Sequence, residues 1–267
     1  YKYEEAARQG ATAILIIHET VGAGYDFSIP RKSSISPGLY QEPVAGDPEP
    51  CPVTGWLSAE AASVLFGAQG HDVEQLRSDA CIRGFSGFEM GASISLRLIN
   101  THLRNSSMNV AGILRGTTRP EEAVVISAHW DHFGIGEKEN GDSIYNGAVD
   151  NGTSMAWALE IGEAFSSMKK RPERSVILFF PTAEEQGLLG SSWFVANPPV
   201  RQENLIACFN NDLLLPIGRM KDMMVTGYGQ SDLDDMLAGA ASRQGRYLMP
   251  DPNPETGMYF RSDHFPF

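Results

Sequence analysis

The chain has 267 residues, of which 42% are hydrophobic, and a formal net charge of −12. This length is enough for one large domain, or for a core domain with a smaller companion. The acidic balance argues against a nucleic-acid-binding protein or a protein of anionic membrane surfaces, because binding phosphate groups requires clustered Lys and Arg. No apolar run approaches the roughly eighteen residues that a membrane-spanning helix needs, so no membrane span is predicted.

The first third of the chain predicts a small segment of mixed structure. The stretch 22–55 is rich in Gly, Pro and Ser, which indicates loops with brief strands. Gly10 is a typical residue after the end of a helix, and Ser58 is a typical N-cap. The elements expected around them are a helix over 3–9, a strand over 13–17, and helices over 58–67 and 72–80.

Near residue 92 the pattern changes to alternating strands and helices, and we place a domain boundary there, between domains of residues 1–92 and 93–267. The expected strands are 93–99, 109–115, 123–128, 175–180 and 205–209, and the expected helices are 153–168, 188–196 and 232–244. Such alternation is typical of an α/β fold, here with a mixed, largely parallel sheet and helices on both faces. The preceding segment is expected to be smaller and β-rich.

Acidic and imidazole side chains follow three of the expected strands. His129 and Asp131 come directly after the strand 123–128, and Asp150 closes the loop that leads into the next helix. The further candidates are Glu184 and Glu185 after the strand 175–180, Asp212 after the strand 205–209, and His264 near the end of the chain. Sites in sheets of this kind form beyond the carboxyl ends of the strands, so we expect these side chains at one edge.

Each candidate also has an ordinary explanation. A His after a strand is more often a structural residue, Asp150 resembles part of a turn, and two adjacent Glu residues resemble the start of a solvated helix. Their gathering at one edge is harder to explain, because repulsion among Asp150, Glu185 and Asp212 is unfavourable without cations. Two divalent ions remove that repulsion. Zinc suits a mixture of imidazole and carboxylate ligands, whereas magnesium prefers oxygen ligands alone.

The motifs that carry these residues resemble the co-catalytic di-zinc aminopeptidases, a family that also contains glutamate carboxypeptidase and the transferrin receptor ectodomain. The resemblance covers roughly residues 93–267. The segments concerned are, in order, AHWDHFG, NGAVDNGTSMAWALEIGEAF, RSVILFFPTAEEQGLLGS, FNND and RSDH. The resemblance implies a zinc-exopeptidase fold and a metal-dependent exopeptidase, an aminopeptidase in preference to a carboxypeptidase, that acts on peptides and binds two Zn²⁺ per chain.

The resemblance also implies a role for each residue. Asp150 would bridge the two ions, with His129 and Asp212 on one ion, and Glu185 and His264 on the other. Asp131 would act in catalysis by orienting the imidazole of His129, as carboxylates commonly do behind metal-bound histidines. Glu184 would be the general base that takes a proton from a hydroxide-forming water between the two ions.

The segment KYEEAARQGATAILIIH, with the Gly-rich stretch after it, resembles the tail of a protease-associated domain. This resemblance implies a partial domain of that kind over residues 1–92 and an extracytoplasmic location, periplasmic or secreted. In such a location Cys51 and Cys81 could pair. Members of the family normally continue past the final His, so we expect the catalytic domain to be truncated after Phe267. The oligomeric state is not predicted.

Other functions remain open at this point. Receptor-like relatives lose metal ligands, whereas all five expected ligands and the base are present here. A single-zinc relative that cyclises N-terminal glutamine is distinguished from a peptidase by metal content. A serine hydrolase is disfavoured because the G-x-S-x-G motif is missing, and Gly84-Phe85-Ser86-Gly87 has the wrong spacing.

Overall fold

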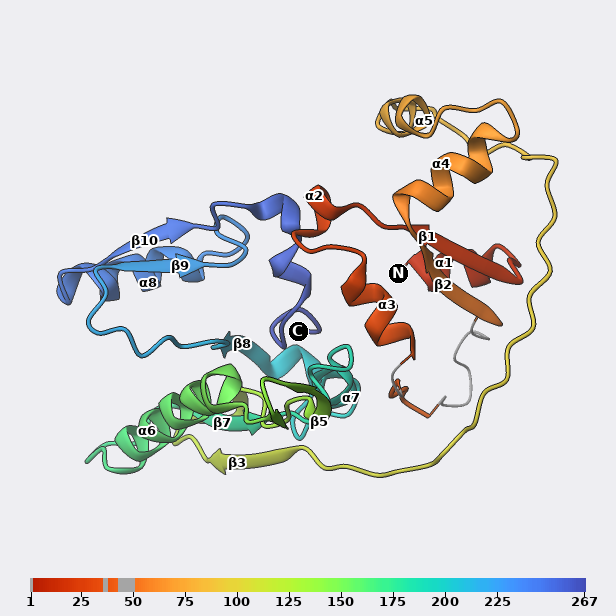
Figure 1. Cartoon of the computed structure of the whole chain (residues 1–267). Coiled ribbons are helices and arrows are strands. Elements are labelled where there is room, and N and C mark those ends of the chain that lie inside the picture. Colours follow the sequence, from red (N-terminus) through yellow and green to blue (C-terminus); the bar gives the residue numbers. More distant parts are fainter. Residues whose placement is uncertain (1, 36–37, 43–50) are drawn as a thin grey trace. The chain divides into compact units, whose positions relative to one another are not determined.

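The computed structural model describes residues 2–35, 38–42 and 51–267. The chain forms two compact units, Tyr1–Gly38 with Glu42–Arg104, and Leu39–Gln41 with Asn105–Phe267. The units thus divide about a dozen residues beyond the change of pattern near residue 92, within an extended stretch that leads to the next strand (Figure 1). Among the described residues, no helix has the length and apolar character needed to cross a bilayer.

The first unit is built on a pair of parallel strands, β1 (Ala13–Ile17) and β2 (Val53–Leu57). The helices of this unit are α1 (Lys2–Arg8), α2 (Thr20–Ala23), α3 (Ser28–Ile35), α4 (Ala59–Gly67) and α5 (Val73–Ala80). Helix α4 begins as predicted, because Ser58 Oγ accepts a hydrogen bond from the backbone N–H of Ala61 at 3.1 Å.

Two predictions for this unit are corrected by the structure. Helices α2 and α3 lie in the Gly-, Pro- and Ser-rich stretch 22–55 or just before it, where loops with brief strands were expected. Pro30 is compatible with α3 because it lies in the first turn, where its missing N–H has no partner to lose. The described part of the unit is therefore more helical than the predicted β-rich segment, and residues 36–37 and 43–50 lie outside the described residues. Its relation to a protease-associated domain stays a prediction.

Cys51, Cys81 and Cys208 are free thiols in this structure. Cys51 is buried and its Sγ donates to the backbone oxygens of Val53 and Ala11 at 3.3 and 3.4 Å. Cys81 is exposed at the end of α5. The pair considered from the sequence is therefore not formed.

The second unit contains a four-stranded mixed sheet. Its strands are β3 (Val110–Leu114), β4 (Arg119–Ser127), β7 (Arg174–Phe180) and β8 (Leu205–Asn210), in the spatial order β3-β7-β4-β8. Strands β7 and β8 both run parallel to β4, and β3 runs antiparallel to β7. This arrangement confirms the predicted mixed, largely parallel sheet.

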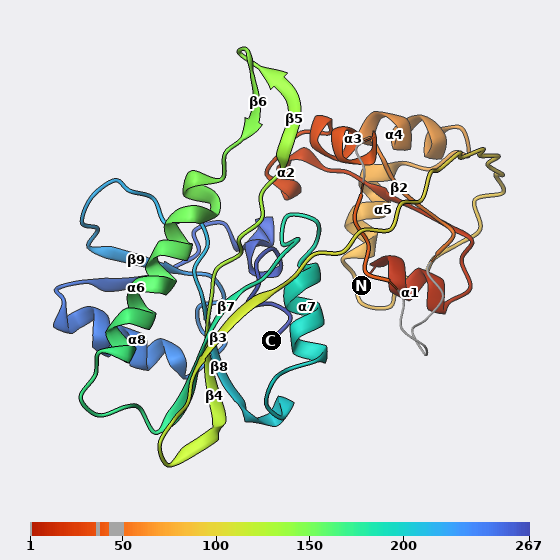
Figure 2. The same cartoon turned by 90° about the horizontal axis from the view of Figure 1, so that it is seen from below.

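Helices cover both faces of this sheet, because alternate residues of the strands point to opposite sides. On one face Val125 and Phe179 pack against Phe194 of α7 (Leu189–Ala196). On the other face Ile126 and Val176 pack against Ala158 of α6 (Ser154–Ser166). Figure 2 shows α6 and α7 on opposite sides of the strands. Burying each large apolar side chain contributes about 1.5–3 kcal/mol, so these two layers hold the sheet in place.

The remaining elements of the unit are small. They are the antiparallel hairpin β5 (Gly134–Glu139) and β6 (Asp142–Tyr145), the parallel pair β9 (Asp222–Val225) and β10 (Tyr247–Pro250), and α8 (Leu233–Arg243). The predicted strand over 93–99 is not formed. Its alternating apolar side chains Ile94, Leu96 and Leu98 are exposed in the described structure, so the alternation there does not form a buried face.

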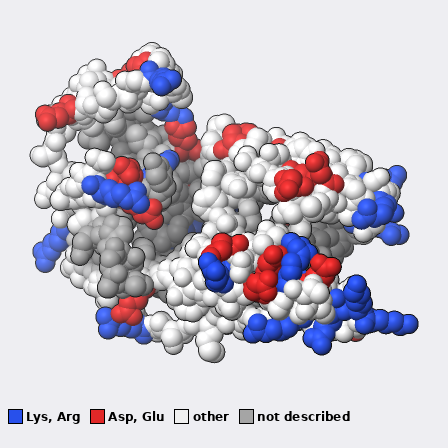
Figure 3. Space-filling model, turned by 180° about the vertical axis from the view of Figure 1, so that it is seen from behind, with Lys and Arg blue, Asp and Glu red and all other residues white. Residues whose placement is uncertain are grey.

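The surface charge is mixed. On the face drawn in Figure 3, Lys and Arg side chains lie in small groups with Asp and Glu side chains, and uncharged residues lie between these groups. Such interspersed charge gives no single-sign field of the kind that steers a polyanion. The absence of a nucleic-acid partner nevertheless stays a prediction from the sequence.

Candidate metal centre

The carboxyl ends of three neighbouring strands bring the predicted site residues together. In the register of the sheet, Ser127 of β4 lies opposite Phe179 of β7 and Asn210 of β8. Strands β4, β7 and β8 end near these three residues. Just beyond them, the backbone N–H of Trp130 still donates to Pro181 O at 3.1 Å. The segments that follow carry His129, Glu184, Glu185 and Asp212, so their position results from strand register.

Nε2 of His129 faces carboxylate oxygens from three different segments. It lies 3.1 Å from Asp150 Oδ1, 3.3 Å from Asp212 Oδ1 and 3.8 Å from Glu184 Oε2. The imidazole is 1% exposed. A single Nε2–H cannot serve three acceptors, and Asp150 Oδ1 is buried without a hydrogen-bond partner among the described residues. A cation among these atoms would satisfy all of them.

The loops that carry Asp150 and Asp212 are tied together by their neighbouring amides. Asn151 donates from Nδ2 to the backbone oxygen of Asn211 at 3.1 Å and accepts from the N–H of Leu213 at 3.3 Å. The side chain of Asn211 in turn accepts from Ser154 Oγ at 3.1 Å. Asn151 was not among the residues selected from the sequence, and the structure makes it a buried link between two acidic loops.

Asp131 holds the segment that contains both glutamates. Its carboxylate accepts the backbone N–H groups of Glu184 and Glu185, at 3.0 and 3.3 Å. The same carboxylate is 3.8 Å from Nδ1 of His129, whereas Nδ1 lies 3.1 Å from the backbone oxygen of Asp131. The hydrogen bonds therefore show Asp131 anchoring the glutamate loop. Its predicted role behind His129 stays a prediction.

A second cluster contains a residue that sequence reasoning did not select. His132, Asp150 and Glu185 offer ligand atoms that all lie within 4.8 Å of one another. Nδ1 of His132 is only 2.6 Å from Glu185 Oε1. The AHWDHFG motif contains this second His, but nothing in the sequence shows that it meets a glutamate 53 positions further on.

His264 lies close to Asp212 but outside the two clusters formed by the described residues. Its ring contacts that of Tyr259, with 5.2 Å between the ring centres, and its Nε2 is buried without a hydrogen-bond partner among the described residues. Ser262 connects the same motif to β8, because its Oγ donates to Asp212 Oδ2 and accepts from Asn210 Nδ2, both at 2.6 Å. The predicted ligation by His264 stays a prediction.

Burial and charge shift the protonation of the central groups. Burial alone would lower the pKa of His129, but the hydrogen bond to Asp212 and the charges of Glu184, Asp212 and Asp263 raise it to about 10. Burial raises the pKa of Glu184 to about 9, although the charge of His129 opposes the shift. Burial likewise raises the pKa of Asp263, which is 0% exposed, to about 7. The metal-free site thus favours the protonated forms of all three groups.

These shifts predict how pH affects the stability of protein stripped of metal. The ordinary pKa values are 6.5 for His129, 4.5 for Glu184 and 3.8 for Asp263, and all three are raised by folding. The stabilisation by protonated His129 is full below about pH 6.5 and is lost as pH rises towards 10. Over the same range, ionising Glu184 and Asp263 opposes folding.

We therefore expect the free energy of unfolding of the chelator-treated protein to be at least ~1 kcal/mol lower at about pH 9 than at about pH 6. Thermal unfolding at the two pH values measures the difference. Zinc should reduce it, because a cation takes the place of the His129 proton. Equal stability of the metal-free protein at both pH values would contradict the pKa shifts.

The spacing and chemistry of the donors fit zinc. Ligand atoms about 2.0 Å from a tetrahedral zinc ion lie about 3.3 Å apart. The distances from His129 Nε2 to Asp150 Oδ1 and Asp212 Oδ1, 3.1 and 3.3 Å, are close to this value. The donors are one imidazole nitrogen and several carboxylate oxygens, which zinc accepts together.

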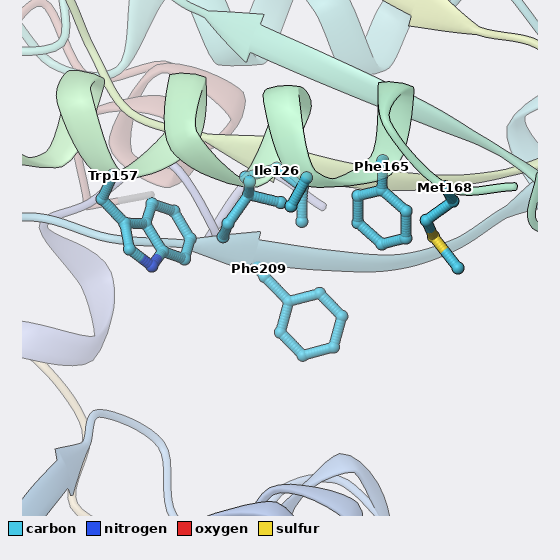
Figure 4. A pocket seen from close by; sticks show the side chains of 7 residues that line it. Ile126, Trp157, Phe165, Met168 and Phe209 are labelled. Carbon is cyan, nitrogen blue, oxygen red and sulfur yellow. The ribbon is translucent and has the colours of Figure 1, made fainter.

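An apolar pocket of about 480 Å³ lies elsewhere in the unit, on the α6 side of β4 and β8. Its lining consists of hydrophobic side chains, among them Ile126, Trp157 and Phe209 (Figure 4). It offers no titratable group, so the chemistry of the chain is assigned to the acidic cluster.

Comparison with known proteins agrees with this geometry. Residues 109–267, more than half of the chain, match the family model of peptidase family M28. The chain belongs to this family. The M28 match begins next to β3 and includes every residue of both clusters, which confirms the family predicted from the motifs.

Relatives of known name cover the same region. The M28 chain is 33% identical over 132 residues to aminopeptidase NAALADL1 of Rattus norvegicus, which is 47% of this chain and 16% of that protein. It is 30% identical over 114 residues to carboxypeptidase Q of Bos taurus, which is 42% of this chain and 22% of that protein. The chain therefore spans less than a quarter of the length of these relatives.

A solved structure is also similar. BSAP, a zinc aminopeptidase from Bacillus subtilis, is 25% identical with a TM-score of 0.44, over 60% of this chain and 36% of that one.

Proposed function

We propose that the second unit is the catalytic core of a zinc-dependent exopeptidase that removes N-terminal residues from peptides. The observation that carries the proposal is the position of His129 Nε2, within 3.1–3.8 Å of carboxylate oxygens from three separate segments. Buried acids gathered in this way favour a divalent cation. Membership of peptidase family M28 supports peptide substrates.

We propose that the chain holds two zinc ions with Asp150 shared between them. His129 and Asp212 would complete one set of ligands, and Glu185 and His264 the other, as the motifs imply. The bound zinc supplies a polarised substrate carbonyl and a water molecule of lowered pKa. Nε2 of His264 and Oδ1 of Asp150, which have no hydrogen-bond partner in the part of the chain that the structure describes, are atoms suited to such ligation.

Glu184 is suited to be the general base. Its side chain is 8% exposed, and its backbone is fixed by the hydrogen bond from its N–H to Asp131. It would take a proton from the attacking water and pass it to the departing amine. Burial raises the pKa of Glu184, and nearby cations would lower it again, because opposite charge favours the ionised carboxylate.

The preference for a free N-terminus over a free C-terminus is proposed from the motif resemblance. The names of the relatives do not decide the matter, since one is an aminopeptidase and another a carboxypeptidase. An extracytoplasmic location remains a proposal from the motif resemblance.

Removal and return of zinc test this function. We expect hydrolysis of aminoacyl anilides to disappear after treatment with a strong chelator and to recover fully as about two zinc equivalents per chain are added. N-acetylated anilides should not be cleaved. Activity that survives complete metal removal would contradict the proposal. Release of C-terminal residues from N-blocked peptides would instead indicate a carboxypeptidase, and saturation at one equivalent with cyclisation of N-terminal glutamine would indicate a cyclase.

A further inference from the structure

His132 makes the shortest described contact in the second cluster. Its Nδ1 lies 2.6 Å from Glu185 Oε1, and the two side chains are 20% and 14% exposed. The roles expected from the motifs, five metal ligands and a general base, include none for His132 and so do not account for this contact. A histidine that faces a metal-site glutamate can either share the metal or hold the glutamate.

The distance decides between these two roles. Two ligand atoms on one tetrahedral zinc ion lie about 3.3 Å apart. The 2.6 Å between Nδ1 and Oε1 is too short for that arrangement and is the length of a strong charge-assisted hydrogen bond. An ionised carboxylate only accepts hydrogen bonds, so Nδ1 of His132 is the donor.

The surrounding chain fixes the ring of His132. Its centre lies 4.9 Å from the ring of Phe133 and 6.3 Å from the ring of Tyr145. On another side is Gly147, which has a φ of +65° and leaves little room for a side chain. A Cβ there would be 3.0 Å from His132 Cβ and 3.1 Å from Asp150 O. The imidazole is therefore packed into place from both the hairpin and the loop that carries Asp150.

The hydrogen bond leaves one carboxylate oxygen of Glu185 for a cation. Oε1 is engaged by His132, and the backbone N–H of Glu185 is held by Asp131. Glu185 is thus fixed at both its main chain and its side chain. Carboxylates that bind metals are commonly held in this way, and loss of the supporting group weakens metal binding by about 10–100-fold.

We propose that His132 is a positioning residue that orients Glu185 towards the second zinc ion and does not bind the ion itself. This inference rests on the proposed function. It extends the M28 site by one residue. It also explains why Gly147 lies so close to His132, since this contact helps to hold the imidazole in place.

Zinc affinity measured by competition with a chromophoric chelator tests the proposal in the full chain. We expect His132→Leu to weaken one of the two zinc sites by about 10–100-fold. His132→Asn should remain within about threefold of wild type, because its amide N–H₂ can donate from nearly the position of Nδ1. Tyr145→Leu is the matched control, since it removes packing against the ring and leaves the hydrogen bond. It should lower the thermal stability without a comparable loss of zinc affinity.

A double-mutant cycle completes the test. In a Glu185→Gln background, His132→Leu should cause little further loss of zinc affinity, because the residue acts through Glu185. If His132→Asn binds zinc as weakly as His132→Leu, then His132 is itself a ligand and the proposal is wrong. It is also wrong if His132→Leu has wild-type affinity. A wild-type chain that binds no zinc would instead overturn the proposed function together with this inference, so the two failures are distinguishable.

Discussion

Glu184→Gln is expected to lower kcat by about 10²–10⁴-fold while leaving both zinc ions bound. Gln has nearly the shape of Glu but cannot take a proton from water. The backbone N–H of residue 184 would still donate to Asp131, so the loop should keep its position. Single-turnover and steady-state hydrolysis of aminoacyl anilides, with zinc content measured on the same samples, would determine both quantities.

Glu185→Gln is the matched control for this variant. It is the same exchange at the adjacent position, where the carboxylate is expected to bind metal. We expect Glu185→Gln to lose zinc affinity and Glu184→Gln to retain it. If both variants lost zinc equally, or if Glu184→Gln hydrolysed substrate at the wild-type rate, Glu184 would not be the base.

Asp150→Asn is expected to remove both zinc ions at micromolar free zinc and therefore all measurable turnover. Oδ1 of Asp150 lies 3.1 Å from Nε2 of His129, and the same side chain belongs to the cluster of His132 and Glu185. A neutral amide in this shared position is a poor zinc ligand. Metal analysis after dialysis and the anilide assay measure the two effects.

The stability of this variant separates a local effect from misfolding. Chelator-treated Asp150→Asn should unfold cooperatively near the temperature of chelator-treated wild type, because the exchange relieves repulsion of Glu185 and loses attraction to protonated His129, and these effects oppose each other. Asp142→Asn in the exposed strand β6 is the control and should keep both zinc ions. Retention of two ions by Asp150→Asn would contradict its place between them.

The centre of the sheet could be predicted closely from the sequence because β4 and β7 are largely buried. The apolar runs at 123–128, 175–180 and 205–209 correspond to β4, β7 and β8 within a few residues. Continuous burial leaves a continuous hydrophobic run, which is the strongest strand signal available. The alternating apolar pattern at 93–99 was misleading, since its apolar side chains are exposed and no strand forms there.

The missed elements are short or exposed. The hairpin of β5 and β6 turns at Asn140 and Gly141, whose φ values are +51° and +95°. Asn-Gly is the most typical sequence for such a turn, so this signal was available. Strands β9 and β10 have four residues each and are only partly buried, so they carry little pattern to detect.

The convergence of the site was predictable from strand order, but its supporting contacts were not. His129, Asp150, Glu185 and Asp212 follow strand ends or helix starts, and the parallel sheet brings such positions to one edge. Asn151 and His132 act through partners about 50–60 residues away. No local pattern in the sequence indicates which residue so far along the chain will be the partner.

The two apolar layers under α6 and α7 have a consequence for engineering this scaffold. The side chains that hold the molecule together lie between helix and sheet, whereas the reactive side chains lie beyond the strand ends on segments tied by a few polar contacts. The apolar packing and the reactive chemistry thus depend largely on different residues, and the buried site residues affect stability through their protonation. Substitutions of the acidic residues beyond the strand ends should therefore leave the packing between helices and sheet in place.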